Sequence, residues 1–390
     1  MRAILTALHR YGGLAMAGFL IIAGLSGSIL AFRFELDSGL NPHLFRVEPA
    51  GAALPVSQLV AHVERADPAV AVLTILPATK AGETASAYVG PRDGRVVDYN
   101  QVFLDPATGR ILGRRMDGAF RLDRAHVIPL LYRFHYSLLI PGWGTLLMGV
   151  VAVAWLIDCF VGWVLTLPRG RPFWRKWRPI WGIKQGAGGY RLNLDLHRAT
   201  GLWLWPVLFL LALSSMALNL NHELFRPVLS ALLPTSPSIW DRPSPAEPPA
   251  MVLDWDAAVA AAQAEAGRRG LDGPVGMIYA ARAQGFYMLR VGHRHAPGFG
   301  TSALFISGVD GSILSVDEAG GGQAGDRIAG LMFPLHSGQI AGLPGRILIC
   351  IAGLAVAMLS VTGIYIWWKK RAARLSRKAS AAGVPRQSHR

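Results

Sequence analysis

The sequence predicts a membrane protein of α-helices plus α+β units. We expect four transmembrane helices in two parallel repeats, with each repeat carrying one α+β unit outside the membrane. Three observations predict this fold class. Of the 390 residues, 52% are hydrophobic and only 16% are charged. Several uncharged apolar stretches approach the roughly 20 residues that cross a bilayer. Segments of the first half of the chain also return in the second half.

Four apolar stretches predict the membrane spans. They are about Gly12–Phe32, Thr145–Leu167, Leu202–Leu220 and Arg346–Trp368. By position alone, the first stretch could be a secretory signal peptide. Its apolar part is longer than the usual core of a signal peptide, and a near copy lies deep in the chain at Leu196–Leu224, so we interpret it as a true span.

The spans divide the chain into eight predicted segments. They are 1–34 (amino-terminus and first span), 35–140 (first outer unit), 141–168 (second span), 169–196 (basic inner loop), 197–221 (third span), 222–342 (second outer unit, with a proline-rich linker at 234–250), 343–368 (fourth span) and 369–390 (basic inner tail).

Charge predicts the orientation of these segments. The chain has a net charge of +15, and its excess of Lys and Arg lies before the first span, in 167–198 and after the fourth span, where Asp195 is the only acid. Because Lys and Arg concentrate on the cytoplasmic side, both termini are predicted to be cytoplasmic. The regions 33–144 and 221–345 are then outside, which is the periplasm if the membrane is a bacterial inner membrane.

The same distribution argues against nucleic acid as a partner, because the positive charge is a topology signal rather than a binding face. The stretch Arg171–Trp181 and the tail Lys369–Lys378 are instead predicted to face anionic lipid headgroups. The two cysteines, Cys159 and Cys350, both lie in apolar runs. They therefore predict neither a disulfide framework nor a thiolate metal cluster.

The internal repeat covers both the spans and the outer units. Leu8–Leu14 returns as Leu196–Leu202, and Phe103–Leu112 returns as Phe305–Leu314. Each half contains two spans, so the two repeats are predicted to be parallel, with their axis along the membrane normal.

Each outer unit reads as one helix followed by alternating strands joined by turns. The predicted helices are Val56–Arg65 and Trp255–Arg268. The predicted strands are Val70–Leu76, Ser86–Val89 and Val97–Leu104 in the first unit, and Val275–Tyr279, Phe286–Val291 and Ala303–Ser307 in the second.

Four of the eleven histidines recur in pairs across the repeat. His9 and His197 stand at the inner ends of the two outgoing spans, and His135 and His336 stand at the outer ends of the two returning spans. In a parallel two-fold arrangement each pair can face the axis, where helix bundles build cofactor sites. The alternative is that each histidine only anchors the chain at the membrane interface or caps a helix.

Two facing neutral imidazoles without other ligand types suit the axial positions of haem iron better than tetrahedral zinc. Because Cys-x-x-Cys-His is absent from the sequence, haem would be of the b type. Arg10, Arg198 and Arg133 lie beside the candidate ligands, where they could pair with haem propionates. Two haem b groups, one near each face, would divide an apolar core of about 30 Å into steps that an electron can cross.

Three further residues are weaker candidates. Asp158 is an acid in the middle of the second span, and its match in the fourth span is Leu359. It predicts either a proton path or cofactor contact, or a hydrogen bond to a neighbouring Ser or Trp. His222, whose counterpart is Phe34, and His126, which has no matched partner, could be reserve ligands or substrate contacts. No catalytic residue is predicted.

Over nearly its whole length the chain resembles the PepSY-associated transmembrane family. The resemblance rests on the His-Arg…Gly-Leu opening of the first and third spans and on the Asp-Pro-x-x-Gly-x-Ile-Leu hairpin. It also rests on the His-Tyr-Ser-Leu and Leu-His-Ser-Gly approaches to the returning spans. Members with four spans, two PepSY units and no fused cytoplasmic domain are similar to inner-membrane ferric-siderophore reductases, including the ferrioxamine type.

That resemblance implies a di-haem oxidoreductase that passes electrons outward to a periplasmic ferric siderophore and releases Fe(II). It favours His9, His197, His135 and His336 as axial ligands. Phe34, at the position that matches His222, leaves a scheme with six histidines without support. Hard hydroxamate oxygens hold Fe(III) more strongly than Fe(II), so a one-electron reduction would release the iron.

The inner segments are too short for a flavin or nicotinamide domain, and Gly186–Gly189 lacks the strand and helix context of a dinucleotide fingerprint. Electrons are therefore expected from membrane quinol or from a cytoplasmic reductase. Two other classes remain open. One is a PepSY binding or regulatory protein without redox activity, and the other is a permease for iron or siderophore.

Overall fold

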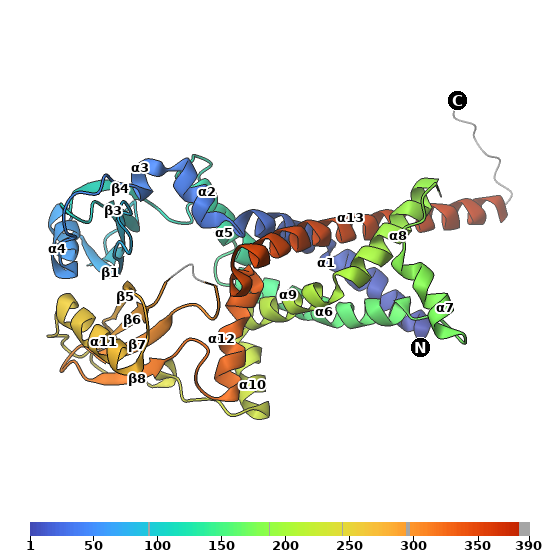
Figure 1. The fold of residues 1–390 in the computed structure, drawn as a ribbon. Coiled ribbons are helices and arrows are strands. Elements are labelled where there is room, and N and C mark those ends of the chain that lie inside the picture. The colour runs from blue at the N-terminus through green and yellow to red at the C-terminus, as the bar shows by residue number, and fades with distance from the viewer. Residues whose placement is uncertain (93, 187, 244, 294–296, 382–390) are drawn as a thin grey trace. The chain divides into compact units, whose positions relative to one another are not determined.

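The computed structural model describes residues 1–381 apart from 93, 187, 244 and 294–296, and the described chain divides into two compact units. The helical unit comprises Met1–Ala31, His135–Asn221 and Ile347–Arg390. The sheet unit comprises Phe32–Phe134 and His222–Arg346 (Figure 1). The last nine residues of the predicted basic tail lie outside the described residues.

Long apolar helices make up most of the helical unit. Its elements are α1 (Arg2–Leu30), α6 (Gly144–Thr166), α7 (Phe173–Trp177), the 3-10 helix η1 (Arg178–Trp181), α8 (Gly188–Trp203), α9 (Trp205–Asn219) and α13 (Gly342–Ala381), whose first turn belongs to the sheet unit. Within the described residues, Arg2–Leu30, Gly144–Thr166 and Gln339–Arg377 are each long and apolar enough to cross a membrane. The chain is thus a membrane protein, as the sequence predicts.

The third predicted span, Leu202–Leu220, is not one straight helix. The chain bends by 70° where α8 ends at Trp203 and α9 begins at Trp205. Pro206 stands in the first turn of α9, where its missing N–H costs no helical hydrogen bond. A proline also disfavours the helical conformation of the residue before it. Helices α8 and α9 make up a fourth candidate span only if they are counted together as one bent helix.

Small residues bring α1 and α13 into contact. A β-carbon on Gly24 would lie 2.5 Å from the carbonyl oxygen of Gly353, and one on Gly353 would lie 2.5 Å from that of Gly24. The Ser28 hydroxyl donates to the carbonyl oxygen of Cys350 across the same contact, at 2.8 Å. Such close approach of backbones is typical of helix packing in membranes.

Within its described residues, the sheet unit contains eight strands and ten helical elements. The strands are β1 (Val70–Leu76), β2 (Ala85–Pro91), β3 (Gln101–Leu104), β4 (Ile111–Arg115), β5 (Val275–Ala281), β6 (Phe286–Val291), β7 (Ser302–Ser307) and β8 (Ile313–Asp317). The helical elements are α2 (Arg33–Leu40), α3 (Pro42–Phe45), α4 (Val56–Ala66), α5 (Val127–Ser137), the π-helical turn η2 (Asn221–Phe225), α10 (Arg226–Leu232), η3 (Ile239–Asp241), α11 (Trp255–Arg269), α12 (Ala324–Ser337) and η4 (Gln339–Ala341). Two of these cross the unit boundary: the last three residues of α5 and the first residue of η2 belong to the helical unit.

All eight strands form one antiparallel sheet in the order β4-β3-β2-β1-β5-β6-β7-β8. The first half of the chain supplies four neighbouring strands and the second half supplies the other four. The halves join where Thr74 pairs with Tyr279 and Ile75 pairs with Ile278. The α+β prediction is therefore confirmed, and the two predicted outer units share a single sheet. The parallel arrangement of the repeats remains a prediction.

One face of this sheet carries the main apolar core. Helices α4 and α11 lie on it, and side chains such as Leu59, Val63, Ile278, Leu289 and Leu304 are almost completely buried there. Alternation of apolar residues in the strands places one set of side chains toward the helices. Burial of this apolar surface is the dominant favourable contribution to folding of the unit.

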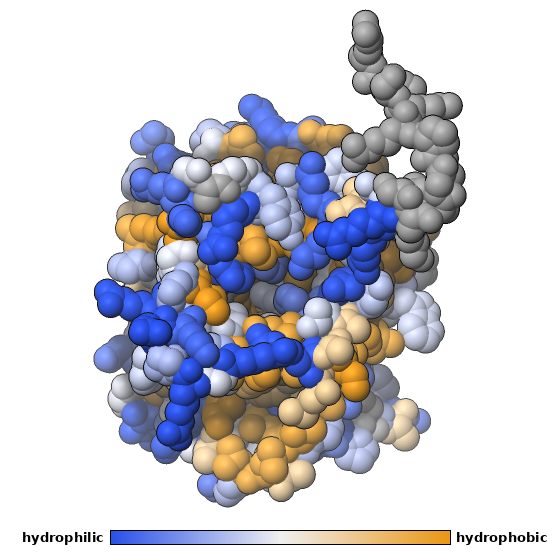
Figure 2. Space-filling view, turned by 90° about the vertical axis from the view of Figure 1, so that its right-hand side faces the viewer, coloured by the Kyte–Doolittle hydropathy of each residue, from blue (hydrophilic) through white to orange (hydrophobic). Residues whose placement is uncertain are grey.

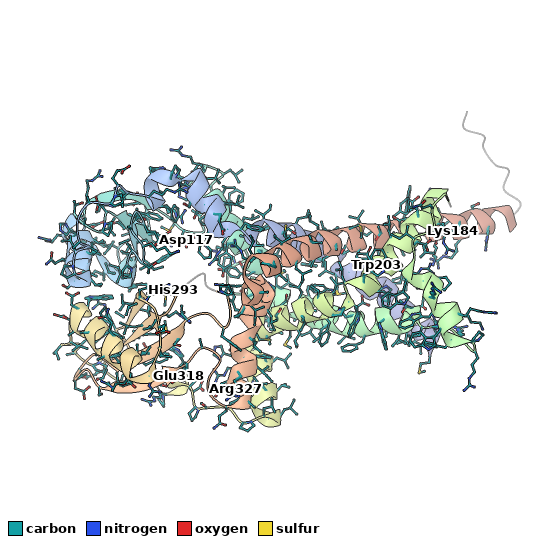
Figure 3. All side chains as sticks on the ribbon, viewed as in Figure 1. Asp117, Lys184, Trp203, His293, Glu318 and Arg327 are labelled. Atoms are coloured by element: carbon teal, nitrogen blue, oxygen red, sulfur yellow. The ribbon has the colours of Figure 1, made fainter. Side chains whose placement is uncertain are left out.

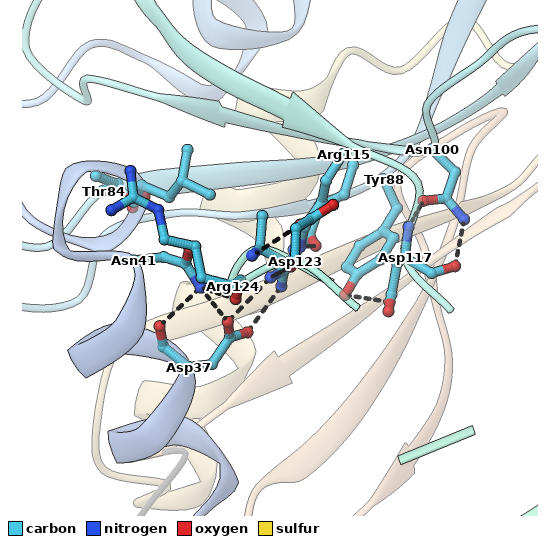
Figure 4. A network of polar contacts seen from close by, with 12 residues as sticks. Asp37, Asn41, Thr84, Tyr88, Asn100, Arg115, Asp117, Asp123 and Arg124 are labelled. Atoms are coloured by element: carbon cyan, nitrogen blue, oxygen red, sulfur yellow. Dashed lines mark hydrogen bonds and ion pairs between the residues drawn. The ribbon is translucent and has the colours of Figure 1, made fainter. Parts of the chain in front are cut away.

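A polar network ties α2 to the sheet (Figure 4). Arg115, at the end of β4, donates from Nη1 and Nη2 to the two carboxylate oxygens of Asp37, at 3.0 and 2.9 Å. Its Nε donates to Gln101 at 2.8 Å. Nearby, Tyr88 donates to Asp117 at 3.1 Å, and burial together with that carboxylate raises the pKa of Tyr88. The Tyr88 hydroxyl therefore keeps its proton and serves as a donor.

Candidate functional site

A cavity of about 520 Å³ lies inside the helical unit, among α1, α6, α8, α9 and α13. This volume is in the range of sites that bury small ligands and cofactors. Its walls are mainly apolar and aromatic, including Trp155, Trp163 and Trp205. Lys184 and Trp203, labelled in Figure 3, mark the two ends of the segment that contains α8.

The structure brings two of the predicted histidines together in this cavity. His9 comes from α1 and His197 from α8, and the centres of their rings lie 6.1 Å apart with an angle of 61° between the ring planes. Because a metal–imidazole bond is about 2 Å long, an ion held between two imidazoles sets their ring centres about 6 Å apart. The spacing of His9 and His197 fits one metal centre with two nitrogen ligands.

Hydrogen bonds fix the tautomer of both rings. The Nδ1 atom of His9 lies 2.9 and 3.1 Å from the two carboxylate oxygens of Asp158 on α6. The Nδ1 atom of His197 lies 3.1 Å from the carbonyl oxygen of Leu359 and 3.0 Å from the Thr362 hydroxyl, both on α13. A carboxylate and a carbonyl can only accept, so we assign the proton to Nδ1 in each ring. Each Nε2 then carries the lone pair that a metal ion needs.

Glycines make room for these rings. A β-carbon on Gly162 would lie 3.4 Å from Cε1 of His9, and one on Gly363 would lie 3.4 Å from Cε1 of His197. Both glycines line the cavity. They match each other in the sequence repeat, so the same device occurs on α6 and on α13.

The arginines predicted near these ligands divide into two groups. Arg10 and Arg198 line the cavity together with Arg2 and Lys370, so its wall includes four cationic side chains. Arg198 also pairs through Nη2 with the fully buried Asp195, and its buried Nε has no hydrogen-bond partner in the described part of the chain. Hydrophilic side chains gather on the face of the molecule that carries the amino-terminus (Figure 2). The cavity therefore offers positive charge to an anionic group.

Arg133 lies elsewhere. It belongs to α5 in the sheet unit, where its Nη1 donates to the carbonyl oxygen of Gly118 at 3.3 Å. It does not line the cavity that holds His9 and His197. Its predicted pairing with a propionate can concern only the second, outer pair of histidines.

The other two predicted ligands fall in different units. His135, near the end of α5, belongs to the helical unit, and its Nδ1 lies 2.8 Å from the Ser26 hydroxyl of α1. Burial lowers the pKa of His135 to about 4, so its ring is neutral at neutral pH. A β-carbon on Gly27 would lie 3.0 Å from its Cε1. His336 belongs to α12 in the sheet unit, and the pairing of His135 with His336 remains a prediction.

Sequence reasoning identified Asp158 but not its partner. Of its two predicted roles, the structure shows a contact with a candidate ligand, because its carboxylate bonds to His9 rather than to a Ser or Trp. Thr362 and the Leu359 carbonyl were missed as partners of His197. Thr362 could have been noticed in the sequence as a polar residue next to Gly363. The Leu359 carbonyl belongs to the backbone, so no sequence pattern identifies it as a partner.

The two reserve histidines lie outside the cavity. His222 belongs to η2 and His126 precedes α5, both in the sheet unit. His126 is buried, and its Nδ1 lies 2.6 Å from a carboxylate oxygen of Asp123. Among the described residues, no three His, Cys, Asp or Glu side chains come together in a group that could hold a metal ion.

Comparison with known proteins places this chain in a family. The model of the family described as the PepSY-associated TM region matches residues 6–370, which is nearly the whole chain. No curated protein matches the chain closely enough to count as a relative. The chain therefore belongs to the family of PepSY-associated transmembrane proteins.

Proposed function

We propose that this protein is an oxidoreductase of a bacterial inner membrane, which carries two haem b groups and reduces the Fe(III) of a periplasmic siderophore. The observation that supports it best is the pair formed by His9 and His197. Their rings have metal-ligand spacing, their tautomers are fixed, and they line a cavity of cofactor size. Membership of the PepSY-associated transmembrane family supports the membrane location. The redox activity is our own inference.

The residues present fit a haem at this site. His9 and His197 would hold the iron through Nε2, and Arg10 and Arg198 would pair with the propionates. When bound, haem supplies a one-electron couple between Fe(III) and Fe(II). The Trp and Leu side chains of the wall would exclude water from the haem ring, and Gly162 and Gly363 leave room for both imidazoles at the cavity surface.

We infer a second haem at His135 and His336, as the repeat in the sequence suggests. In this scheme both termini are cytoplasmic, and the two repeats are parallel. One electron enters from membrane quinol or a cytoplasmic reductase and leaves at the outer side. There it converts Fe(III) to Fe(II), which hydroxamate oxygens hold weakly, and the chelator is released unchanged.

The first test is a spectrum of the full chain purified in detergent, air-oxidised and then reduced with dithionite, with haem quantified per chain. We expect two haem b groups, and we expect reoxidation by a ferric siderophore together with release of Fe(II) to a chelating dye. His9→Ala and His197→Ala should each remove one haem, whereas His293→Ala, at an exposed position of the sheet unit, should remove none. Colourless protein from haem-replete cells would leave PepSY binding as the function to pursue.

The break between α8 and α9 favours a permease as the second candidate. Discontinuous helices line the substrate sites of many transporters, and this one lies beside the cavity, because Trp205 is part of the cavity wall. A permease would move ferric siderophore into proteoliposomes without a reductant. Uptake of iron that requires neither haem nor an electron donor would support it over the reductase.

A further inference from the structure

The two histidines of the cavity have unequal partners. His9 faces the carboxylate of Asp158, whereas His197 faces a backbone carbonyl and a hydroxyl. The difference arises at two positions of the sequence repeat, and at the first of them Asp158 on α6 matches Leu359 on α13. Val161 likewise stands where the other half has Thr362. One half of the repeat therefore carries a charged acceptor that the other half lacks.

The contact between Asp158 and His9 is close and partly shielded from solvent. Both carboxylate oxygens lie within 3.1 Å of Nδ1, and the Asp158 side chain is 17% exposed. Asp158 is also the only carboxylate among the described residues that line the cavity. Such a carboxylate–histidine contact raises the basicity of the ring as a metal ligand. In a poorly solvated site this electrostatic effect is stronger than it would be in water.

We propose that Asp158 is a positioning residue that lowers the reduction potential of the inner site by increasing electron donation from His9. This inference rests on the proposed function. Its physical basis is that a carboxylate behind the ring stabilises the more positive Fe(III) state more than the Fe(II) state. By contrast, the Nδ1 atom of His135 contacts the neutral hydroxyl of Ser26.

The carboxylate at His9, where His135 has a hydroxyl, would give the electron a direction. One electron leaves the inner site, which is oxidised, and enters the outer site, which is reduced, and no proton or other reactant is needed. The transfer is downhill if the inner site has the lower potential. Asp158 would then favour transfer outward toward the substrate without touching either the substrate or the electron donor.

The test is a potentiometric titration of the full haem-loaded chain, followed by its visible spectrum. Asp158→Asn keeps an oxygen that can accept from Nδ1 but removes the charge. At a fixed ambient potential, we expect the ratio of Fe(II) to Fe(III) in the lower-potential component to rise about tenfold. This change corresponds to an increase of about 59 mV in the reduction potential of a one-electron couple. The higher-potential component should not move.

Three further variants ensure that the test does not depend on Asp158→Asn alone. Asp158→Glu keeps the charge and should keep the low potential. Thr362→Val installs the matched residue of the other half and leaves the Leu359 carbonyl as acceptor, so it should shift neither component appreciably. Leu359→Asp places a carboxylate behind His197 and should lower the potential of the same component. It therefore tests the idea even if Asp158→Asn loses its haem.

The outcomes separate this inference from the proposed function. A fully loaded Asp158→Asn protein with both potentials unchanged would overturn the role of Asp158. So would a Leu359→Asp protein that keeps its haem at the original potential. Wild-type protein that binds no haem would instead overturn the proposed function itself, before any variant is measured.

Discussion

Two glycines, Gly162 and Gly363, provide the space that the His9 and His197 rings occupy at the cavity. His9 and His197 each lie over a glycine on the facing helix, and both glycines would place a β-carbon at 3.4 Å from the ring. An alanine would just be tolerated at that distance, whereas a branched side chain would occupy the space of the ring itself. The small residues in these helices thus make room for the candidate ligands as well as for helix packing.

We predict that Gly162→Leu displaces His9 and removes about half of the haem from the purified chain. The helix itself should not suffer, because Leu is favoured over Gly in a helix interior by about 1 kcal/mol. Gly18→Leu, in α1, is the matched control and should keep its haem, because no atom of the described residues lies within 4 Å of an added β-carbon there. Equal haem content in the two variants, measured as pyridine haemochrome per chain, would contradict this account of Gly162.

The buried ion pair of the sheet unit leads to a second prediction. The Arg115 and Asp37 side chains are only 5% and 11% exposed, so removal of one partner leaves an uncompensated charge inside the protein. Arg115→Met should destabilise this unit by about 3–5 kcal/mol. Arg121→Met, at an exposed pair with Asp123, should cost about 0–1 kcal/mol. Hydrogen exchange of the β3 and β4 amides measures the loss of stability in both variants. Similar exchange rates in the two variants would contradict a stabilising role of the Arg115–Asp37 pair.

At the scale of residues, the sequence predicted the His9–His197 pair but not the atoms that orient it. The repeated His-Arg pair before the first and third predicted spans can be recognised from the sequence alone. The role of Asp158 depends on which face of α6 meets α1, and an apolar helix with little periodicity does not reveal this. Arg133 lies two residues before His135 on α5, and its pairing with a propionate stays a prediction.

At the scale of elements, the join between β1 and β5 can be tested directly. Facing residues of adjacent antiparallel strands have their β-carbons about 4.5–5.5 Å apart, close enough for a disulfide after a small adjustment. Thr74→Cys combined with Tyr279→Cys should therefore crosslink under oxidising conditions. After proteolysis between the two strands, the fragments should stay together until a reductant is added.

The control for this crosslink uses the next strand. Ser86 lies on β2, which is separated from β5 by β1, and it pairs with Leu76 rather than with Thr74, so its distance to Tyr279 exceeds two strand spacings, or roughly 9.6 Å. Ser86→Cys with Tyr279→Cys should not crosslink. Efficient crosslinking of the control pair, or none of the Thr74 and Tyr279 pair, would contradict the strand order.

Strands with regular alternation were predictable, and their assembly was not. The apolar pattern of β1, β2, β5, β6 and β7 appears in the sequence, and β4 and β8 follow the Gly109 and Gly311 turns as second strands of hairpins. The strands of the two halves pair at Thr74–Tyr279 and Ile75–Ile278, and no local pattern specifies this pairing. The break at Leu204 could have been expected from Pro206 alone.

At the scale of the whole molecule, the positive charge predicts the orientation of the chain. Alkaline phosphatase requires disulfides, which form in the periplasm and not in the cytoplasm. Fused after Arg390 it should be inactive, and inserted at Ala246, in the exposed linker, it should be active. The reverse pattern in living cells would show that both termini are periplasmic and that the charge pattern was misread.

The shared sheet makes biosynthesis of the two halves interdependent. Ile75 and Ile278 pair although about 200 residues separate them, and α6, α8 and α9 lie between them in the chain. Closing so long a loop is slow, and β1 keeps an unpaired edge until β5 has been synthesised. During that interval the first half offers a template for aggregation. We therefore expect truncation before β5 to yield a species that depends on chaperones or is degraded, rather than a stable half-protein.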